Sequence, residues 1–379
     1  MLTLISFSKR MKKIIYLLAM FTLSSCVYPY TPDIDDSQIE SSLVIDANIL
    51  LGNTSTITLS YLQPLDLSHS IVYRRAKGEI YLEDSEGDKY PAVTYYDLYR
   101  IPTFPVKENV QYRLTVIADN KTYRSDWIEP TAPPEITDVN FTADNTQVYV
   151  RVSLEDHGQG SGYASASFEE IWKFHTDYVR LYGYIPETNS VHMLMYPDES
   201  HIWCWRKNIL GYSYNIDYSA LDGVVKDYSI FHFLRTSDRN HQEYNIRVKV
   251  WNLTPEQYRF RKILEENESI GGDLFSPEPG EVRGNVYCED DEDEKVFGYV
   301  NVSRVAMKDA KLNSRYDLWT APKSLIEVAP EDYLDFYNNG YNPVEQIPSA
   351  EGGMVVGWGL GRCYDCVLAG GTLEKPSFE

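Results

Sequence analysis

The sequence predicts a mainly β protein, α+β overall, in which an immunoglobulin-like antiparallel β-sandwich precedes a larger β-rich domain with one or a few short helices. Two observations lead to this prediction. Apolar and polar residues alternate over many short runs, and turn-forming residues separate these runs. One segment, near residues 255–267, instead carries the signals of a helix. A chain of 379 residues is long enough for two or three domains of ordinary size.

Residues 11–26 have the layout of a bacterial export signal. Two lysines precede an apolar stretch that is shorter than the roughly 20 residues a membrane span requires. The segment ends in Leu23-Ser24-Ser25-Cys26, which matches a lipobox, the motif that precedes acylation of a cysteine. We therefore expect residues 1–25 to be a signal peptide, with Met11 as the true start, and the mature protein to hang from a membrane by lipid on Cys26. An ordinary signal peptide with an incidental cysteine is the alternative.

The composition is acidic. Losing residues 1–25 would remove four basic residues and no acids, which changes the formal net charge from −21 to −25. Such a chain repels phosphate backbones, so nucleic acid is not an expected partner. Residues 26–40 are rich in tyrosine, proline and aspartate and have no periodicity, which predicts a flexible tether between lipid and domain.

Residues 41–130 contain the alternating runs of the predicted sandwich. Turn residues at 84–87 follow the run that contains Ile80 and Leu82, and turn residues at 119–121 follow the run from Tyr112 to Val116. A proline-rich linker at 129–134 then separates this domain from the larger one, predicted over 134–379. The alternating apolar positions of the sandwich are Leu43, Ile45, Ala47, Ile49, Ile57, Leu59, Tyr61, Ile80, Leu82, Tyr112, Leu114 and Val116.

The larger domain has two clear strand patterns and one helix. Val148 to Leu154 and Tyr244 to Val250 alternate strictly. The helix starts with Thr254 as N-cap, Pro255 at the first helical position and Gln257 completing a capping box. Leu253 and Tyr258 occupy the hydrophobic-staple positions. The predicted apolar face is Phe260, Ile263 and Leu264, and Gly271-Gly272 is the predicted end.

Four cysteines remain once Cys26 carries lipid: Cys204, Cys288, Cys363 and Cys366. In an oxidising compartment they predict two disulfides, for which three pairings are possible. We favour Cys363–Cys366 with Cys204–Cys288, so that a disulfide staples the chain terminus. A redox role for the Cys-Tyr-Asp-Cys run is less favoured because no helix pattern follows it. A zinc site would need a second such pair.

A series of motifs runs along the chain in a specific order. The motifs are Glu169-Glu170-Ile171-Trp172, Cys204-Trp205-Arg206, residues 254–258, 271–279, 284–286, 296–300 and 363–366, Gly370-Gly371-Thr372 and Lys375-Pro376-Ser377-Phe378. Their order resembles the domain-of-unknown-function family 4249, outer-membrane lipoproteins of Gram-negative bacteria rich in TonB-dependent uptake systems. The resemblance implies an accessory lipoprotein, often beside a TonB-dependent receptor, and supplies no catalytic residues. Glu379 departs from it, where an aromatic residue is expected.

The acidic run Glu289, Asp290, Asp291, Glu292, Asp293 and Glu294 is the weak candidate for a metal site. Calcium loops alternate acids and include a glycine turn, and this run does neither. A solvated loop is therefore the favoured interpretation. The seven histidines form no metal-binding spacing, and we expect no cofactor.

Two glutamates and the tyrosines are the remaining candidates. Glu169 and Glu170 are neighbours on a predicted strand and so point to opposite faces, which does not suit a pair of catalytic carboxylates. We expect one of them to pair with an arginine such as Arg206 inside the domain. The 31 tyrosines are mostly expected to pack within half-buried strands, with one exposed cluster in a binding role.

Three functions follow from these observations. The favoured one is a lipid-anchored, non-catalytic accessory or ligand-binding protein of the outer membrane that partners a TonB-dependent transporter. Asp33, Asp35 and Asp36 slightly favour the cell surface over the periplasmic side, because acids after the lipidated cysteine mark surface export in related lipoproteins. The alternatives are a surface hydrolase acting on glycans or peptides and a structural, adhesin-like component.

Overall fold

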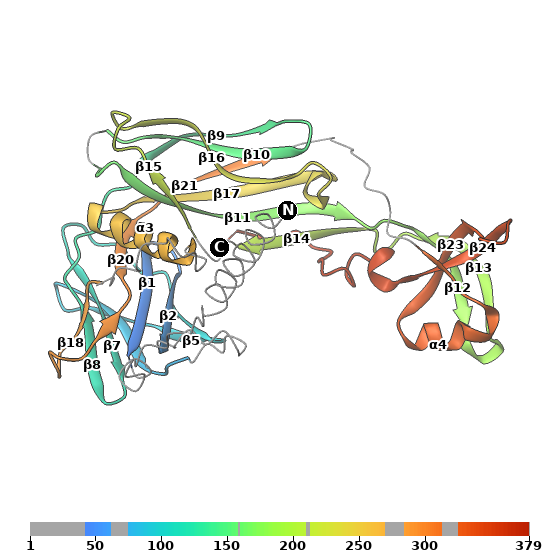
Figure 1. Cartoon of the computed structure of the whole chain (residues 1–379), viewed down its shortest axis with the longest axis horizontal. Helices are drawn as coiled ribbons and strands as arrows, with labels where there is room; N and C mark the ends of the chain where they lie inside the picture. The colour runs from blue at the N-terminus through green and yellow to red at the C-terminus, as the bar shows by residue number, and fades with distance from the viewer. Residues whose placement is uncertain are drawn as a thin grey trace, which may run out of the picture.

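The chain forms two β-sandwiches and a smaller projecting unit, which we call the arm (residues 177–200 and 325–364) (Figure 1). The computed structural model describes residues 42–61, 75–157, 160–209, 213–269, 284–312 and 325–378. The export signal, Cys26, the tether and the predicted helix end at 271–272 lie outside these ranges. The prediction of a mainly β, largely antiparallel protein is confirmed.

The first sandwich packs two sheets around one apolar core, in which every predicted inward residue except the half-buried Tyr61 is buried. One sheet consists of β5 (Val93–Tyr95), β6 (Leu98–Ile101), β2 (Ser55–Tyr61) and β1 (Leu43–Leu51), with β19 (Val296–Phe297) and β20 (Val300–Arg304) beside β1. The other consists of β4 (Lys89–Pro91), β3 (Glu79–Asp84), β7 (Tyr112–Ala118), β8 (Lys121–Ser125) and β18 (Val286–Cys288).

Residues 286–304 therefore belong to the first sandwich, which corrects the predicted division at residues 130–134. β20 runs parallel to β1, and its Val300 and Val302 are buried in the first core. Gly298 lies between β19 and β20 with φ of +106°, and a Cβ there would clash with the carbonyl oxygen of Ile45. Parallel pairing between such distant segments leaves no local hairpin signal in the sequence.

The second sandwich packs a three-stranded sheet on a five-stranded one. All four alternating residues from Val148 to Leu154 are buried, as are those from Tyr244 to Val250. The smaller sheet consists of β16 (Val224–Leu234), β10 (Gln147–Glu155) and β9 (Glu135–Ala143). The larger consists of β14 (Trp203–Ile209), β11 (Tyr163–His175), β17 (Glu243–Asn252) and β21 (Ala306–Leu312), with β15 (Tyr214–Asp217) beside β11.

Helix α3 (Pro255–Ser269) begins as predicted. Gln257 Oε1 accepts from the N–H of Thr254 at 2.8 Å, and Thr254 Oγ1 accepts from the N–H of Gln257 at 3.2 Å, which is a capping box. The predicted apolar face is only partly correct, because Leu264 is largely exposed. Gln257 donates a hydrogen bond to Asn301 of β20 in the first sandwich, and Arg261 donates one to Ser165 of β11 in the second. The helix therefore joins the two sandwiches through polar contacts. No helix in the described ranges is long and apolar enough to cross a membrane.

The arm consists of two small sheets and a short helix, and it stands apart from the sandwiches in Figure 1. Its core is formed by Leu325, Val344 and Tyr364, with Tyr178 and Ile347 packed against them. Its elements are the hairpin β12 (Arg180–Ile185) and β13 (Ser190–Asp198), the sheet β22 (Ile326–Glu327), β24 (Met354–Leu360) and β23 (Tyr341–Pro348), and α4 (Tyr333–Asn338).

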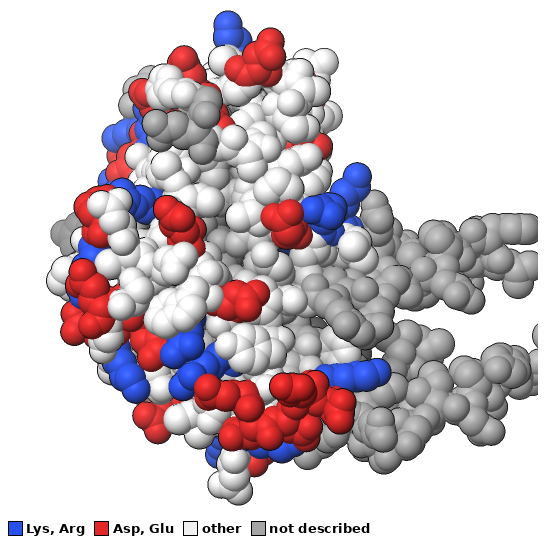
Figure 2. All heavy atoms as spheres, turned by 90° about the vertical axis from the view of Figure 1, so that its left-hand side faces the viewer, with Lys and Arg blue, Asp and Glu red and all other residues white. Residues whose placement is uncertain are grey.

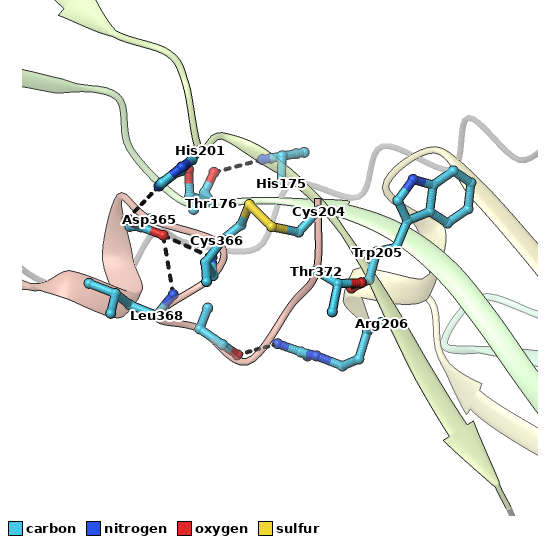
Figure 3. Close-up of a disulfide and its surroundings, with 12 residues drawn as sticks. His175, Thr176, His201, Cys204, Trp205, Arg206, Asp365, Cys366, Leu368 and Thr372 are labelled. Carbon is cyan, nitrogen blue, oxygen red and sulfur yellow. Dashed lines mark hydrogen bonds and ion pairs between the residues drawn. A yellow bond between two sulfur atoms is a disulfide. The ribbon is translucent and has the colours of Figure 1, made fainter. Parts of the chain in front are cut away.

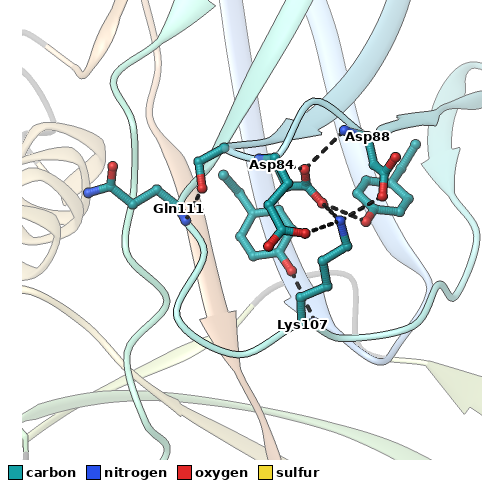
Figure 4. Close-up of polar contacts among 8 residues, drawn as sticks. Asp84, Asp88, Lys107 and Gln111 are labelled. Carbon is teal, nitrogen blue, oxygen red and sulfur yellow. Dashed lines mark hydrogen bonds and ion pairs between the residues drawn. The ribbon is translucent and has the colours of Figure 1, made fainter.

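A buried carboxylate fixes the β3–β4 turn of the first sandwich (Figure 4). Asp84 accepts from the backbone N–H groups of Glu86 and Asp88, from the hydroxyl of Tyr90 and from the ammonium of Lys107. Burial by itself would raise the pKa of Asp84, but these four donors outweigh it and lower the pKa. The carboxylate therefore stays charged and holds the loop that carries Lys107 onto the turn.

Asp84→Ala is expected to lower the free energy of unfolding by about 2 kcal/mol, because it leaves the turn N–H groups and the Tyr90 hydroxyl without their acceptor. Asp88→Asn is the matched control. Asp88 also contacts Lys107, but its side chain is 67% exposed, so we expect little change. Urea denaturation measures both variants, and equal losses would contradict this account of the turn.

Candidate interaction surface

The base of the arm is fastened to the second sandwich by a disulfide between Cys204 of β14 and Cys366 (Figure 3). Beside it, His201 Nδ1 lies 2.9 Å from Asp365 Oδ2, and Arg206 Nη2 donates to the carbonyl of Ala369 at 2.6 Å. The chain that leaves each of the two arm segments, at residues 201–206 and 365–369, is therefore tied to the same place. The arm is held to the body at this root.

Both disulfide pairings that we favoured from the sequence are wrong. Cys366 bonds to Cys204, so it is not available to Cys363, and Cys288 lies buried in the core of the first sandwich without a disulfide. Cys363 is buried in the arm, where its carbonyl accepts from the N–H of Tyr178. The prediction that a disulfide staples the chain terminus holds, with a different partner.

Beyond the disulfide, the C-terminal residues lie along the edge of the second sandwich. Thr372 and Trp205 exchange two backbone hydrogen bonds, of 2.7 and 2.8 Å. Lys375 Nζ lies 2.7 Å from Glu243 Oε1, and the ring of Phe378 lies under the guanidinium of Arg247. Phe378 thus docks the C-terminal residues on the second sandwich, although the last residue, Glu379, is not the aromatic residue that the resemblance leads us to expect.

The contact between Lys375 and Glu243 predicts a pH dependence. Burial by itself would raise the pKa of Glu243, but Lys311, Lys375 and Asn245 outweigh it and lower the pKa to about 2. The stabilisation is therefore complete above the ordinary pKa of 4.5 and is lost as the pH falls through about 2. Because Glu243 is partly exposed to solvent, we expect it to contribute on the order of 1 kcal/mol.

Glu243→Gln should therefore lower stability at pH 7 and make unfolding less dependent on pH between about 5 and 2. Thermal unfolding across this range measures the effect. Glu256→Gln is the control, since Glu256 is 64% exposed and pairs with Arg259 of its own helix. A Glu243→Gln variant with the same acid profile as the native protein would contradict the assignment.

Aromatic side chains pack against one another in the arm, around the buried Trp358. The ring of the fully buried Trp358 lies 5.5 Å from that of Tyr184 and 4.9 Å from that of Tyr333, measured between centroids. The ring of Tyr184 also lies 6.2 Å from that of Tyr333 and 5.1 Å from that of Tyr337. The hydroxyl of Tyr184 donates to Asn189 at 2.8 Å, and Asn189 donates to the carbonyl of Pro330 at 3.0 Å. This agrees with the expectation that most tyrosines pack, and it fixes the β12–β13 hairpin on the rest of the arm.

A large bulge interrupts the β12–β13 ladder on its β13 side. Met193 pairs with Tyr182 and Asp198 pairs with Arg180, so the four residues 194–197 lie opposite Leu181 alone. Bulges redirect side chains, and here Met195 is 88% exposed and Tyr196 is 78% exposed. Met193, just before the bulge, is 69% exposed. We call these three residues the arm knob.

The sequence prediction missed the arm knob. Its signal is the run Met193-Leu194-Met195-Tyr196, four apolar residues in succession without the alternation of a half-buried strand. In a parallel or buried strand such a run lies inside the protein, so the sequence alone does not mark it as exposed. Only the fold places it at the outer edge of a two-stranded sheet, where no other described strand pairs with it.

The acidic run 289–294 is occupied by contacts with strand β8. Arg124 pairs with Glu289, Lys121 pairs with Asp291 and Glu294, and the N–H of Thr122 donates to Asp290. Figure 2, in which the left-hand side of Figure 1 faces the viewer, shows acidic side chains gathered at the lower end of the molecule, with lysine and arginine beside them. Among the described residues, no three histidine, cysteine or acidic side chains are arranged to hold a metal ion. The run also borders an open hollow of about 430 Å³, next to Val286 and Tyr287.

Glu169 and Glu170 are buried, and one of them pairs with an arginine as expected, but that arginine is Arg239 and not Arg206. Glu170 accepts from Arg239 Nε at 2.8 Å and from Nη2 at 2.5 Å, while Arg206 pairs with Asp238. Glu169 lies 2.6 Å from the ammonium of Lys249. Each carboxylate is engaged by its own cation, in line with their placement on opposite faces of β11.

Three comparisons with known proteins complete this description. A family model described as "Domain of unknown function (DUF4249)" matches residues 27–309. No curated protein matches the chain significantly. Among solved structures, the chain is similar to a two fibronectin type-III domain segment from chicken tenascin at 8% identity, with 55% of this chain and 89% of that chain covered and a TM-score of 0.16, which supports no inference. Because the family model covers well over half of the chain, the protein belongs to the DUF4249 family.

Proposed function

We propose that the protein is a lipid-anchored accessory protein of the bacterial outer membrane that binds a TonB-dependent transporter and does not itself catalyse a reaction. Lipid on Cys26 would hold it at the membrane, with the tether 26–40 between the lipid and the first sandwich. The cell surface is the favoured side. The motif at residues 23–26 and the acidic composition support the location, and the resemblance to the outer-membrane lipoproteins supports the partner.

The observation that carries a binding role is the exposure of the arm knob on a unit whose root is fastened to the second sandwich by a disulfide. Met193, Met195 and Tyr196 are exposed to 69%, 88% and 78% and lie close together in the chain, and apolar groups gathered on the surface in this way mark interaction sites. The candidate catalytic carboxylates offer no comparable support, because Glu169 and Glu170 are each held in a buried ion pair. The geometry therefore favours binding over hydrolysis.

Affinity purification from detergent-solubilised outer membranes tests this function. Tagged protein carrying native Cys26 should return a TonB-dependent transporter in near-stoichiometric amount. A preparation that contains the intact lipoprotein and no transporter would overturn the proposed partnership. Turnover of glycan or peptide substrates by the purified protein would overturn the non-catalytic assignment.

A further inference from the structure

The arm knob presents anchor residues on a preformed support. Tyrosine is enriched among the residues that dominate binding energy, and methionine adapts its shape to irregular apolar pockets. The hairpin below the knob is fixed by Tyr184 and Asn189, and the root of the arm by the disulfide at Cys204. Holding an exposed loop in one conformation lowers the entropy lost on binding, so this support favours recognition by the knob.

Recognition by side chains fits this surface better than addition of a strand to β13. The bulge at residues 194–197 breaks the regular backbone ladder at the position where an added strand would have to pair. The same bulge turns Met195 and Tyr196 outward. The complementary surface is therefore a pocket that receives these two side chains, rather than another strand edge.

The charge of the arm specifies the rim of that pocket. The arm, residues 177–200 and 325–364, contains ten aspartates and glutamates, two arginines and no lysine. Asp198 and Glu199 follow the knob after Pro197, and Arg180 Nη2 lies 3.4 Å from Asp198 Oδ2. The net negative charge of the arm disfavours anionic lipid headgroups and favours a protein surface with lysine or arginine around the pocket.

We propose that Met195 and Tyr196 are the anchors by which the arm inserts into an apolar protein pocket rimmed by lysine and arginine. This proposal deepens the proposed function, since it places the contact with the transporter on the arm and states the chemistry of the surface that receives it. Met193 extends the apolar contact. Asp198 and Glu199 beside the anchors in the chain, together with the net negative charge of the arm, favour basic partners.

Photocrosslinking in cells that produce the full chain tests the contact. Benzoylphenylalanine placed at Met195 or at Tyr196 should give one discrete protein adduct. The crosslinked peptide should come from an apolar pocket flanked by lysine or arginine. Tyr96 is the matched control position, because it is an aromatic residue with 85% exposure on the first sandwich, and it should give no such adduct. Adducts with lipid alone, no adduct, or the same adduct from Tyr96 would each overturn the proposal.

A substitution pair measures the strength of the contact. Met195→Ser with Tyr196→Ser should lower the recovery of the partner at least about 30-fold, while Val93→Ser with Tyr96→Ser leaves it unchanged. Raising the salt concentration should weaken the native contact. A circular dichroism spectrum like that of the native protein establishes that each variant is folded. Equal recovery of the partner by the two variants would overturn the role of the knob. Binding of purified Cys26→Ser protein, which carries no lipid of its own, to vesicles of anionic phospholipid would also overturn it.

The outcomes separate this proposal from the proposed function. A transporter recovered without any crosslink at the knob would refute the arm contact and leave the accessory role standing. A discrete, salt-sensitive adduct with another protein would support the knob and refute the transporter as its partner.

Discussion

Arg239→Ala is expected to lower the free energy of unfolding by about 3–5 kcal/mol, because it leaves the carboxylate of Glu170 buried without its cation. The side chain of Glu170 is fully buried in the second sandwich, where it also accepts from Tyr244 at 2.9 Å and from Asn208 at 2.8 Å. Burial, with Glu170 beside it, raises the pKa of Tyr244 well above its ordinary value, so this hydroxyl stays a donor. Two neutral donors do not compensate for the lost guanidinium.

Arg247→Ala is the matched control for this prediction. Arg247 also forms a two-pronged ion pair, with Asp309 at 2.8 and 2.9 Å, but the carboxylate side chain is 53% exposed. We expect the control to cost no more than about 1 kcal/mol. Guanidinium chloride denaturation measures both variants. The account of Glu170 is contradicted when the two losses are equal.

A double substitution separates the buried charge from the packing. If an unpaired charge causes the loss, replacing Glu170 and Arg239 together with methionine should recover much of the stability that Arg239→Ala removes. A double variant that is less stable than Arg239→Ala would show that the network itself, with Tyr244 and Asn208, provides the stability.

The second large effect concerns the disulfide at the root of the arm. Cys204→Ala with Cys366→Ala is expected to cost about 3–5 kcal/mol, because the bond closes a loop between residues 162 positions apart and so limits the unfolded chain. The loss should be greatest in the arm and the C-terminal residues, which the disulfide joins to β14. Hydrogen exchange should show faster exchange at the amides of Thr372 and Trp205, each of which donates to the carbonyl of the other residue.

Reduction of the native protein provides the control. Dithiothreitol should lower the unfolding midpoint of the native protein and should not change that of the double alanine variant. Cys288→Ala should keep the response to dithiothreitol, since Cys288 is outside any disulfide. A native protein whose stability is the same with and without reductant would contradict the role of this bond.

Local patterns predicted the parts of the fold that local patterns determine. Strict alternation identified β10 and β17 because one face of each strand packs on the core, and the residues Thr254 and Gln257 identified the start of α3 because both side chains act within one turn. Leu264 was misassigned because the helix packs at its first turns, through Gln257 and Arg261, and not along a continuous apolar stripe.

Contacts between distant segments could not be predicted in this way. Nothing near Val300 indicates that it pairs with Ala47, and the spacing of the cysteines does not indicate that Cys366 reaches Cys204. The partner of Glu170 was missed for the same reason, because Arg239 lies on a short 3-10 helix, η2 (Asp238–Asn240), after β16. The arm knob depends on a bulge that only the register of β12 and β13 defines.

Acylation of the cysteine at position 26 is the central claim, and incorporation of an alkyne-bearing fatty acid tests it most directly. Cells that produce the native protein and cells that produce Cys26→Ser are fed the fatty acid, and the labelled protein is then followed through membrane fractionation. The native protein should carry label and sediment with the outer membrane, and the variant should carry none. Native protein that is unlabelled and freely soluble would contradict the account.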